Sequence, residues 1–500
     1  MKRTFRKFRL PRAFSALAAA AVFAATALPC AAQGFNWEVH AGLSTHRETN
    51  RGTTDVRYCT GGGVATAGGQ RPPTSSPGYD NLLVQRLHPD NATNPVTWRY
   101  TYDSGQPEQA SEIVEYTDGT GFAVVGTIDS LTTPPVSMLT ISKIDCLGNM
   151  LWQRRYGSTA GVNVAWDLIR ARTGDPAFGT SPGDLIALGE FTASGVTQVR
   201  VVRVTAGGAL IWTRDYSLAG AQLYGRGIAE VDTPSLADNL VVAGGAGNNA
   251  AIFQIDGNNG GFLCGSQLPG LGVSRFNDIT RHGGSGGIAA GFTPVGETRT
   301  TSGALPQILV ASYLSTGCTL QNQIQWGSSS ESEVANAVTL TGSNTFVGVP
   351  AGQLLIVGNV VGPYGGMAAS ADAWSHLMTP VALTPYTAGG YTGRRYGTQG
   401  VGLAGTETAN GVIESTLGAY LVGGTTSNWS GAGDPMQAYT VRMDDTLMNT
   451  LCSVPWKALT GTLTAQSPLT VAGTPGTLSA VLPVLPRSPI PQGFCCGISQ

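Results

Sequence analysis

The chain has 500 residues, 12% of them charged, and a formal net charge of −2 at pH 7. So weak and balanced a charge gives no electrostatic footprint for nucleic acid or for an anionic membrane surface. Glycine contributes 69 residues without a Gly-X-Y repeat, and no segment keeps a helical hydrophobic period. Many short apolar runs separated by glycine-rich turns are typical of one large all-β domain.

The first 32 residues have the three parts of a secretory signal peptide. Residues 1–12 carry six basic side chains and no acid, an apolar run covers residues 13–28, and small residues precede Gln33. The run is too short for a membrane span, and Pro29 stands where a lipoprotein signal needs a small residue. We therefore expect residues 1–32 to be a signal peptide. The mature protein is then expected to be secreted or held at the cell surface of a bacterium.

A repeat of about 59 residues fills the region 33–456. Each copy has an apolar strand ending in glycine, a variable loop, a second apolar strand, a short turn and a Trp-containing strand. Several copies also begin with another short strand, so the unit has four strands. We place the strand glycine seven times, at Gly68, Gly126, Gly189, Gly244, Gly291, Gly358 and Gly423. Such a repeat predicts a β-propeller, with seven four-stranded blades favoured and eight as the alternative.

The Trp-containing strand also indicates how the ring closes. We find it at Trp98, Trp152, Trp212 and Trp326, with weaker copies at Cys264, Tyr396 and Cys452. We expect these tryptophans to pack between blades rather than to stack on a ligand. One more copy stands alone at residues 37–42, beginning with Trp37. A strand from one terminus can complete the blade of the other and remove an open edge, so Trp37 marks our candidate for ring closure.

Residues 143–157 carry the pattern Lys-Ile-Asp-x-x-Gly-Asn-x-x-Trp-Gln-x-x-Tyr-Gly. This pattern resembles the repeats of secreted bacterial β-propeller proteins. It is also similar to the tryptophan-docking motif of PQQ-type quinoprotein dehydrogenases and of the outer-membrane assembly propeller. The resemblance covers roughly residues 35–456, although Trp is missing from at least two copies and the turn Asp is replaced at Thr205. It implies a propeller fold, but such repeats serve dehydrogenases, scaffolds, sugar binders and surface proteins alike.

No motif in the sequence identifies a metal, cofactor or catalytic site. The histidines fall in different repeats without zinc-site spacing, and we interpret them as solvated loop residues; they are His40, His46, His88, His282 and His376. Residues 256–260 have calcium-type ligands but fit a turn better, since the closing Glu is absent. Residues 283–287 match the nucleophile-elbow pattern, but a strand rather than a helix is expected to follow.

The carboxylate neighbours Glu112 and Glu115, and the pair Asp444–Asp445, do not by themselves indicate a catalytic cleft. The adjacent Cys495 and Cys496 are similar to the neighbouring cysteines of quinoproteins, but no cofactor ligand set accompanies them. We therefore assign no catalytic residue, no cofactor and no metal ligand.

Seven cysteines remain after signal cleavage, an odd number, so at least one is free or intermolecular. Export permits disulfides. Cys146 and Cys318 occupy the same turn of two different units, so they are not expected to bond each other.

Residues 457–500 break the repeat and predict a Pro/Gly/Thr-rich tail, which could pack on the propeller, join chains or act in surface delivery. Within the tail, Cys495 and Cys496 are candidates for a disulfide, a cross-link or self-association.

These features favour a binding or structural protein of the surface, adhesion or scaffold type. Its variable loops would present a surface to a protein or glycan partner, and Trp429, in a polar loop, is a candidate contact. The alternative is a propeller enzyme, a hydrolase, lyase or quinoprotein dehydrogenase, with its site in the axial funnel. Clustered acids, histidines or a metal in that funnel would favour the enzyme, whereas small and aliphatic residues would favour the scaffold.

The signal peptide gives a first prediction. Protein recovered outside the cytoplasm should begin near Gln33, because export removes residues 1–32. N-terminal sequencing or intact mass measures this directly. Recovery of exported protein that retains its first 32 residues would contradict the assignment.

Overall fold

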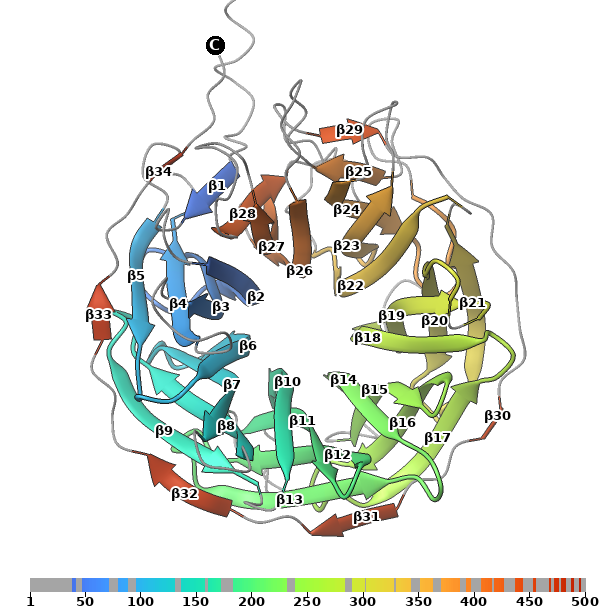
Figure 1. Cartoon of the computed structure of the whole chain (residues 1–500), viewed down its shortest axis with the longest axis horizontal. Coiled ribbons are helices and arrows are strands. Elements are labelled where there is room, and N and C mark those ends of the chain that lie inside the picture. The colour runs from blue at the N-terminus through green and yellow to red at the C-terminus, as the bar shows by residue number, and fades with distance from the viewer. Residues whose placement is uncertain are drawn as a thin grey trace, which may run out of the picture. The chain divides into compact units, whose positions relative to one another are not determined.

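A computed structural model shows a ring of seven antiparallel sheets around a central axis (Figure 1). The structure describes residues 38–41, 47–71, 80–88, 96–130, 136–157, 161–171, 183–231, 239–283, 290–301, 303–327, 330–342, 351–362, 370–386, 393–396, 406–415, 418–426, 437–443, 453–455, 467–468, 472–475, 478–482, 487–489 and 494–495. Every regular element among them is a strand, and none is a helix that could cross a membrane.

Each blade is a four-stranded meander whose first strand faces the axis. Blade 1 consists of β2 (Arg47–Val56), β3 (Gly63–Arg71), β4 (Asn81–Leu87) and β5 (Val96–Tyr102). Blade 2 consists of β6 (Glu108–Glu115), β7 (Phe122–Ser130), β8 (Val136–Ile144) and β9 (Met150–Tyr156). Blade 3 consists of β10 (Val162–Arg170), β11 (Leu185–Ala193), β12 (Val196–Val204) and β13 (Leu210–Ser217). Blade 4 consists of β14 (Leu223–Glu230), β15 (Asn239–Ala246), β16 (Asn249–Asp256) and β17 (Phe262–Leu268).

The remaining three blades follow the same plan. Blade 5 consists of β18 (Val273–His282), β19 (Gly291–Arg299), β20 (Gln307–Leu314) and β21 (Leu320–Trp326). Blade 6 consists of β22 (Ser332–Leu340), β23 (Leu354–Gly362), β24 (Ser370–Met378) and β25 (Gly393–Tyr396). Blade 7 consists of β26 (Thr406–Ser415), β27 (Gly418–Thr426), β28 (Gln437–Met443) and β1 (Glu38–Ala41). The predicted all-β propeller with seven blades is confirmed.

The N-terminal strand completes the last blade. β1 pairs antiparallel with β28, Glu38 opposite Val441 and Ala41 opposite Ala438. The fourth strand of blade 7 therefore comes from the opposite end of the repeat region, and the ring has no open blade at its junction. Trp37 itself lies outside the described residues.

The hydrophobic core is divided among the spaces between neighbouring blades. One cluster, for example, joins Leu188 and Val201 of blade 3 to Val242 and Phe253 of blade 4, all of them buried. The middle strands of each blade are apolar on both faces because both faces are covered by neighbours. A single blade could not bury these faces, so each blade depends on its neighbours for stability.

A bulge in each innermost strand explains the repeated glycine. The register shifts at the same place in every blade, for example between Asn50 and Gly52 of β2. The neighbouring strand carries a glycine there, because a Cβ would overlap a backbone carbonyl oxygen before the bulge. These glycines are Gly68, Gly126, Gly189, Gly244, Gly296, Gly358 and Gly423. The prediction of Gly291 was wrong: it begins β19, and Gly296 stands opposite the bulge.

The tryptophans and tyrosines of the fourth strands hold each blade to the next. Nε1 of Trp98 donates to the Cys146 carbonyl at 3.0 Å, in the turn before the fourth strand of the next blade. Four residues further, the Tyr102 hydroxyl donates to the Gly148 carbonyl at 2.7 Å. Tyr156 and Tyr216 repeat the second contact on Gly208 and Gly260. The indole and phenol thus act as packing and docking groups between blades, as expected of Trp98.

One tryptophan was placed at the wrong position of the repeat. Trp326 pairs with Ile308, just as Tyr156 pairs with Leu139, so it occupies the tyrosine position. The tryptophan position of blade 5 holds Asn322, which pairs with Ser312. Its side chain donates to the Ala382 carbonyl of blade 6 at 3.0 Å and so replaces the indole contact.

Two disulfides reinforce the same blade junctions. Cys59–Cys146 joins blade 1 to blade 2, and Cys264–Cys318 joins blade 4 to blade 5. Cys264 stands at the tryptophan position, so a covalent bond takes the place of the indole contact there. Each bond closes a loop of more than 50 residues (sequence separations 87 and 54) and should stabilise the fold by about 4 kcal/mol. As expected, Cys146 and Cys318 each bond to a different residue.

The C-terminal segment runs around the outside of the ring as short strands (Figure 1). Each pairs antiparallel with the fourth strand of a blade. In chain order they are β29 (Ser453–Pro455) on β25, β30 (Ser467–Pro468) on β17, β31 (Ala472–Pro475) on β13, β32 (Leu478–Leu482) on β9, β33 (Arg487–Pro489) on β5 and β34 (Phe494–Cys495) on β1. Blade 5 has four strands among the described residues.

The two ends of the chain should contribute differently to stability. Deletion of residues 33–42 removes β1, uncovers β28 and leaves one blade incomplete. We expect the melting temperature to fall by at least about 5 °C, or the protein to aggregate. Truncation after residue 456 removes β30–β34 but keeps every four-stranded blade, so the ring should remain folded. Thermal unfolding and light scattering of both variants measure this. If the C-terminal truncation unfolds the protein and the N-terminal deletion does not, the assignment of ring closure is wrong.

Candidate functional site: the axial funnel

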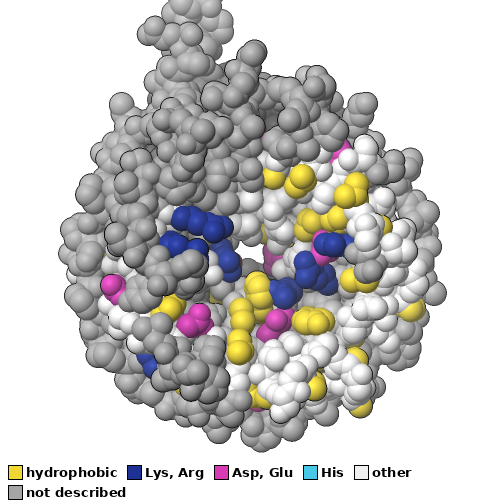
Figure 2. Space-filling view, viewed as in Figure 1, with side chains coloured by type: hydrophobic (Ala, Val, Ile, Leu, Met, Phe, Trp, Pro, Cys, Tyr) yellow, Lys and Arg dark blue, Asp and Glu magenta, His cyan; other side chains and the backbone are white. Residues whose placement is uncertain are grey.

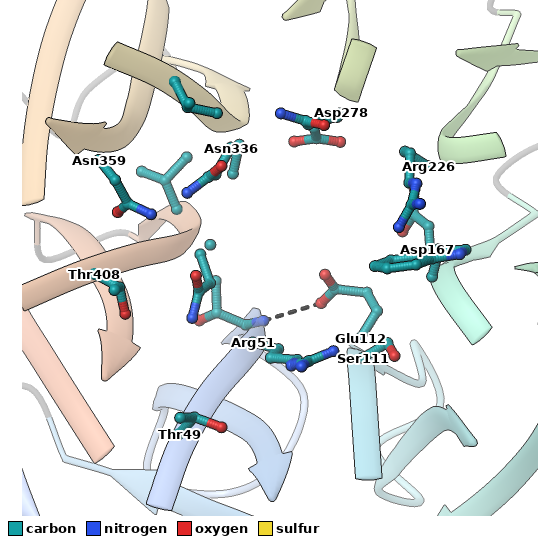
Figure 3. A pocket seen from close by; sticks show the side chains of 18 of the residues that line it. Thr49, Arg51, Ser111, Glu112, Asp167, Arg226, Asp278, Asn336, Asn359 and Thr408 are labelled. Atoms are coloured by element: carbon teal, nitrogen blue, oxygen red, sulfur yellow. Dashed lines mark hydrogen bonds between the residues drawn. The ribbon is translucent and has the colours of Figure 1, made fainter. Parts of the chain in front are cut away.

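A cavity of about 800 Å³ opens along the axis of the ring (Figure 3). Small-molecule sites commonly have 300–1,000 Å³. Its wall is built from the first strands of all the blades, joined by residues from the ends of the second strands. The cavity contains arginine, carboxylate and amide side chains and few apolar ones, so it is a polar site rather than a packed centre.

The bulged residue of each first strand points to this axis. These seven residues are Arg51, Ser111, Trp166, Arg226, Asn277, Asn336 and Asn410. Four of them bond to the first strand of the next blade. Ser111 donates to the Ala165 carbonyl at 2.7 Å, and Asn410 to the Asn50 carbonyl at 2.9 Å, across the closing junction. Asn277 and Asn336 donate in the same way to Ala335 and Ala409.

Three carboxylates directly after the bulge join the blades in pairs. Glu112 of blade 2 accepts from the Thr53 amide of blade 1 at 2.9 Å. Asp167 of blade 3 accepts from the Ile228 amide of blade 4 at 2.7 Å. Asp278 of blade 5 accepts from the Val338 amide of blade 6 at 2.8 Å. Each carboxylate also accepts from the amide of the residue that follows it. Their first role is therefore to fix the innermost strands in register.

Burial raises the pKa of all three acids. It raises the pKa of Asp167 to about 6, although its two amide bonds act in the opposite direction. The pKa values of Glu112 and Asp278 lie well above their ordinary range, because of burial and then the nearby charge of Asp167. The cavity floor therefore carries less negative charge than its composition suggests.

Among the described residues, six arginines line the cavity, and these come from three blades. They are Arg47, Arg51 and Arg71 of blade 1, Arg226 of blade 4, and Arg275 and Arg299 of blade 5. Figure 2 shows basic side chains on two sides of the central hollow. The register places Arg71 opposite Arg47 and Arg299 opposite Val273, so Arg71 and Arg299 hold equivalent positions in their blades.

These guanidinium groups outnumber their carboxylate partners. Arg71 pairs with Asp80 at 2.7 Å, and Arg275 and Arg299 share Glu297 at 2.6 and 3.2 Å. Arg226 lies 3.1 Å from Glu190 and stacks on the Trp166 ring, 3.4 Å from its centroid. Within the described part of the chain, Arg47 and Arg51 have no carboxylate within ion-pair distance. Six guanidinium groups therefore meet three carboxylate partners.

The arginines of different blades are close enough to repel one another. Burial lowers the pKa of Arg226, Glu190 opposes this effect, and the charges of Arg275 and Arg51 lower it further. Burial likewise lowers the pKa of Arg51; the charge of Asp80, which lies beyond ion-pair distance, opposes this effect, and the charge of Arg47 adds to it. Positive charge from blades 1, 4 and 5 thus converges on one cavity.

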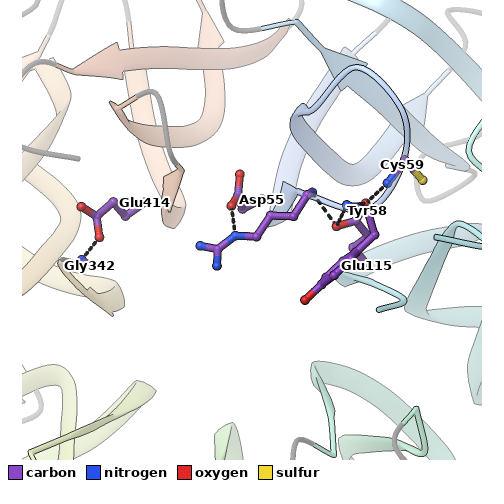
Figure 4. A network of polar contacts seen from close by, with 7 residues as sticks. Asp55, Tyr58, Cys59, Glu115, Gly342 and Glu414 are labelled. Atoms are coloured by element: carbon purple, nitrogen blue, oxygen red, sulfur yellow. Dashed lines mark hydrogen bonds and ion pairs between the residues drawn. The ribbon is translucent and has the colours of Figure 1, made fainter. Parts of the chain in front are cut away.

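The opposite end of the axis has a different chemistry (Figure 4). Arg57, just after β2, forms an ion pair with Asp55 there. Glu115 accepts from the amides of Arg57, Tyr58 and Cys59, the last at 2.7 Å, and so holds the turn that carries Cys59. Glu112 and Glu115, neighbours in the sequence, therefore do different structural work and form no catalytic pair.

Two histidine interpretations were wrong. His282 and His376 are buried in β18 and β24, each with 3% of its surface exposed, and burial lowers the pKa of each to about 4. They belong to the packing of blades 5 and 6, because His376 lies against the Trp326 ring, 5.5 Å between centroids. Among the described residues, no group of three or more His, Cys, Asp or Glu side chains could hold a metal ion.

Other sequence candidates divide between turns and undescribed regions. Asp256 accepts from the Asn258 amide at 2.8 Å, which confirms the turn assignment of residues 256–260. Cys495 lies in β34, where its backbone pairs with His40. The further candidates that fall outside the described residues are Trp429, Cys496, Asp444, Asp445, His46, residues 284–287 and the signal peptide.

The arginines of the funnel were missed by the sequence reasoning. Arg47 and Arg51 share one strand, but the other four come from separate strands, so no local motif marks the cluster. A signal existed at the third residue after the strand glycine, where blades 1 and 5 have Arg71 and Arg299. The misplaced glycine of blade 5 concealed this equivalence.

Comparison with known proteins assigns no family. No protein-family model matches the chain, and no curated protein matches it significantly. The function must therefore be inferred from the funnel itself.

The raised pKa of Asp167 predicts a pH-dependent stability. The folded state holds this proton up to about pH 6, whereas the unfolded carboxyl releases it near pH 4. The contribution is fully present below pH 4 and is lost as the pH rises through 6, by about 3 kcal/mol at most. Asp167→Asn should flatten the unfolding free energy over this range, as measured by urea denaturation at several pH values. An unchanged pH profile would contradict the shift.

Proposed function

We propose that this chain is an exported binding propeller that takes an anionic ligand in its axial funnel. The observation that carries the proposal is the pair Arg47 and Arg51, which line the cavity without a carboxylate partner among the described residues. The signal-like N-terminus supports export, and two disulfides are compatible with an oxidising compartment.

Clustered guanidinium groups need a counter-charge. Arg47 is exposed but Arg51 is partly buried, and holding the Arg51 charge beside other arginines costs free energy unless an anion offsets it. Arginine is suited to that role, because its planar fork binds a carboxylate, sulfate or phosphate through two parallel hydrogen bonds. A purely structural arrangement would supply the acid within the protein, as Asp80 does for Arg71.

The acids of the funnel give weaker support to catalysis. A cluster of acids in the funnel was the feature expected of an enzyme, and Glu112, Asp167 and Asp278 form such a cluster. Each of them, however, accepts one amide of the neighbouring blade and the amide of the residue that follows it. These bonds occupy both carboxyl oxygens of Asp167 and Asp278, whereas Glu112 accepts both amides at Oε1, so one acid rather than a pair keeps an oxygen that no amide holds. A general acid or base needs an oxygen directed at substrate. We therefore favour binding over turnover.

A propeller hydrolase or lyase remains the second candidate, supported by the raised pKa values of Glu112 and Asp278. Perturbed acids beside arginines are frequent in active sites. Prolonged incubation with an acidic oligosaccharide, followed by chromatography, distinguishes the two functions, because a binding protein leaves the oligosaccharide uncleaved.

The variable loops, including Trp429, are proposed as a separate surface that contacts a protein or glycan partner.

The funnel proposal predicts which arginines matter. We expect Arg47→Gln/Arg51→Gln to weaken the binding of citrate, a simple multivalent anion, by at least about tenfold, because two charge-assisted contacts are lost. Isothermal titration calorimetry measures the affinity. Arg57→Gln is the matched control: Arg57 follows the same strand but has its own partner, Asp55, and lies outside the cavity. Equal binding by both variants and the unmodified protein would refute the site.

A further inference from the structure

The wall of the funnel beside the arginines is lined by amide groups with spare acceptors. Asn277, Asn336 and Asn410 come from blades 5, 6 and 7 and use their Nδ2 groups on backbone carbonyls of the next blade. Among the described residues, nothing donates to their Oδ1 atoms. Asn359 is used the other way: its Oδ1 accepts from the Ala409 amide at 2.8 Å, and its Nδ2 remains a donor.

The cavity wall therefore carries two kinds of polar group besides its carboxylates. Blades 1, 4 and 5 supply guanidinium donors, and blades 5, 6 and 7 supply amide oxygens (Figure 3). Guanidinium groups select anionic acceptors, whereas amide oxygens accept only from N–H or O–H donors. A ligand that satisfies both kinds of group must carry carboxylates or sulfates together with several donors in a compact space.

We propose that the ligand is an acidic carbohydrate, specifically a uronic-acid oligosaccharide, held with its carboxylates toward Arg51 and Arg275 and its hydroxyls toward Asn336 and Asn410. This inference rests on the proposed function and names the class of its ligand. A uronate carries a carboxylate and neighbouring hydroxyls on one ring, so one sugar unit offers acceptors to guanidinium groups and donors to amide oxygens. The cavity of about 800 Å³ has room for a short oligomer.

Other anions fit fewer of these groups. Phosphate and citrate engage arginine, but they offer the three amide oxygens few or no donors. An acidic peptide carries one backbone N–H per residue and places its carboxylates on flexible stems, whose ordering costs side-chain entropy. A neutral sugar would satisfy the amides but leave Arg47 and Arg51 without a counter-charge.

Four probes separate these classes. We compare by calorimetry the affinity of the mature protein for trigalacturonate, its methyl ester, citrate and tri-aspartate. Trigalacturonate has carboxylates and many hydroxyls, its methyl ester has the hydroxyls without the charge, and citrate and tri-aspartate have carboxylates with few or no hydroxyls. We expect trigalacturonate to bind at least about tenfold more tightly than each of the other three. The variant Arg51→Gln should reduce the preference for the acid over the ester to less than about threefold, while Arg57→Gln should leave it unchanged.

Each other result has a distinct meaning. Citrate binding as tightly as trigalacturonate would overturn the carbohydrate inference but keep the anion site. Tightest binding of tri-aspartate would assign the site to acidic peptides and overturn it as well. If the methyl ester matched the acid, or if no anion bound, both the inference and the proposed function would be wrong. Circular dichroism of each variant establishes that the ring is folded.

Discussion

One extra residue in each innermost strand sets the geometry on which the site depends. The bulge turns Arg51, Ser111 and the equivalent side chains toward the axis, where a regular strand would alternate between the two faces of the blade. It also brings a carbonyl against the next strand, which is why a glycine recurs there. The same local irregularity therefore supplies the contacts between blades and the lining of the funnel. Where the bulged residue is Ser or Asn it bonds to the next blade, and where it is Arg51 or Arg226 it adds charge instead.

The arginines of the funnel belong to blades that a disulfide joins to a neighbouring blade. All six arginines belong to blades 1, 4 and 5, and each of these blades is joined to a neighbour by a disulfide. Guanidinium groups that repel one another would spread apart on a compliant frame. The disulfides stiffen the junctions of blades 1 and 2 and of blades 4 and 5, so less reorganisation of these arginines is needed when an anion enters. The buried carboxylates act in the same direction, because Glu112, Asp167 and Asp278 connect alternate pairs of blades through backbone amides.

The sequence predicted the features that recur in every blade and missed those that occur in only some blades. Glycines such as Gly68 and aromatic residues such as Trp98 recur because every blade needs them, so self-comparison reveals the fold. Trp326 was misplaced because tryptophan and tyrosine docking positions lie four residues apart and accept the same ring chemistry. The histidines were misread because His282 and His376 stand in strands whose polar face is covered by the next blade. Arg51, Arg226 and Arg275 were not predicted because convergence on an axis joins residues as far apart in the sequence as Arg51 and Arg275, a relation that no local pattern contains.

The central claim is that the funnel, rather than the rim of the propeller, is where this chain binds its ligand. A crystal structure of the mature protein with a short oligouronate tests it most directly. The account predicts the oligomer on the axis, with a carboxylate in contact with Arg51 and a hydroxyl donating to Oδ1 of Asn336 or Asn410. An oligomer bound on the loops or on the outer strands, with the funnel empty, would contradict it.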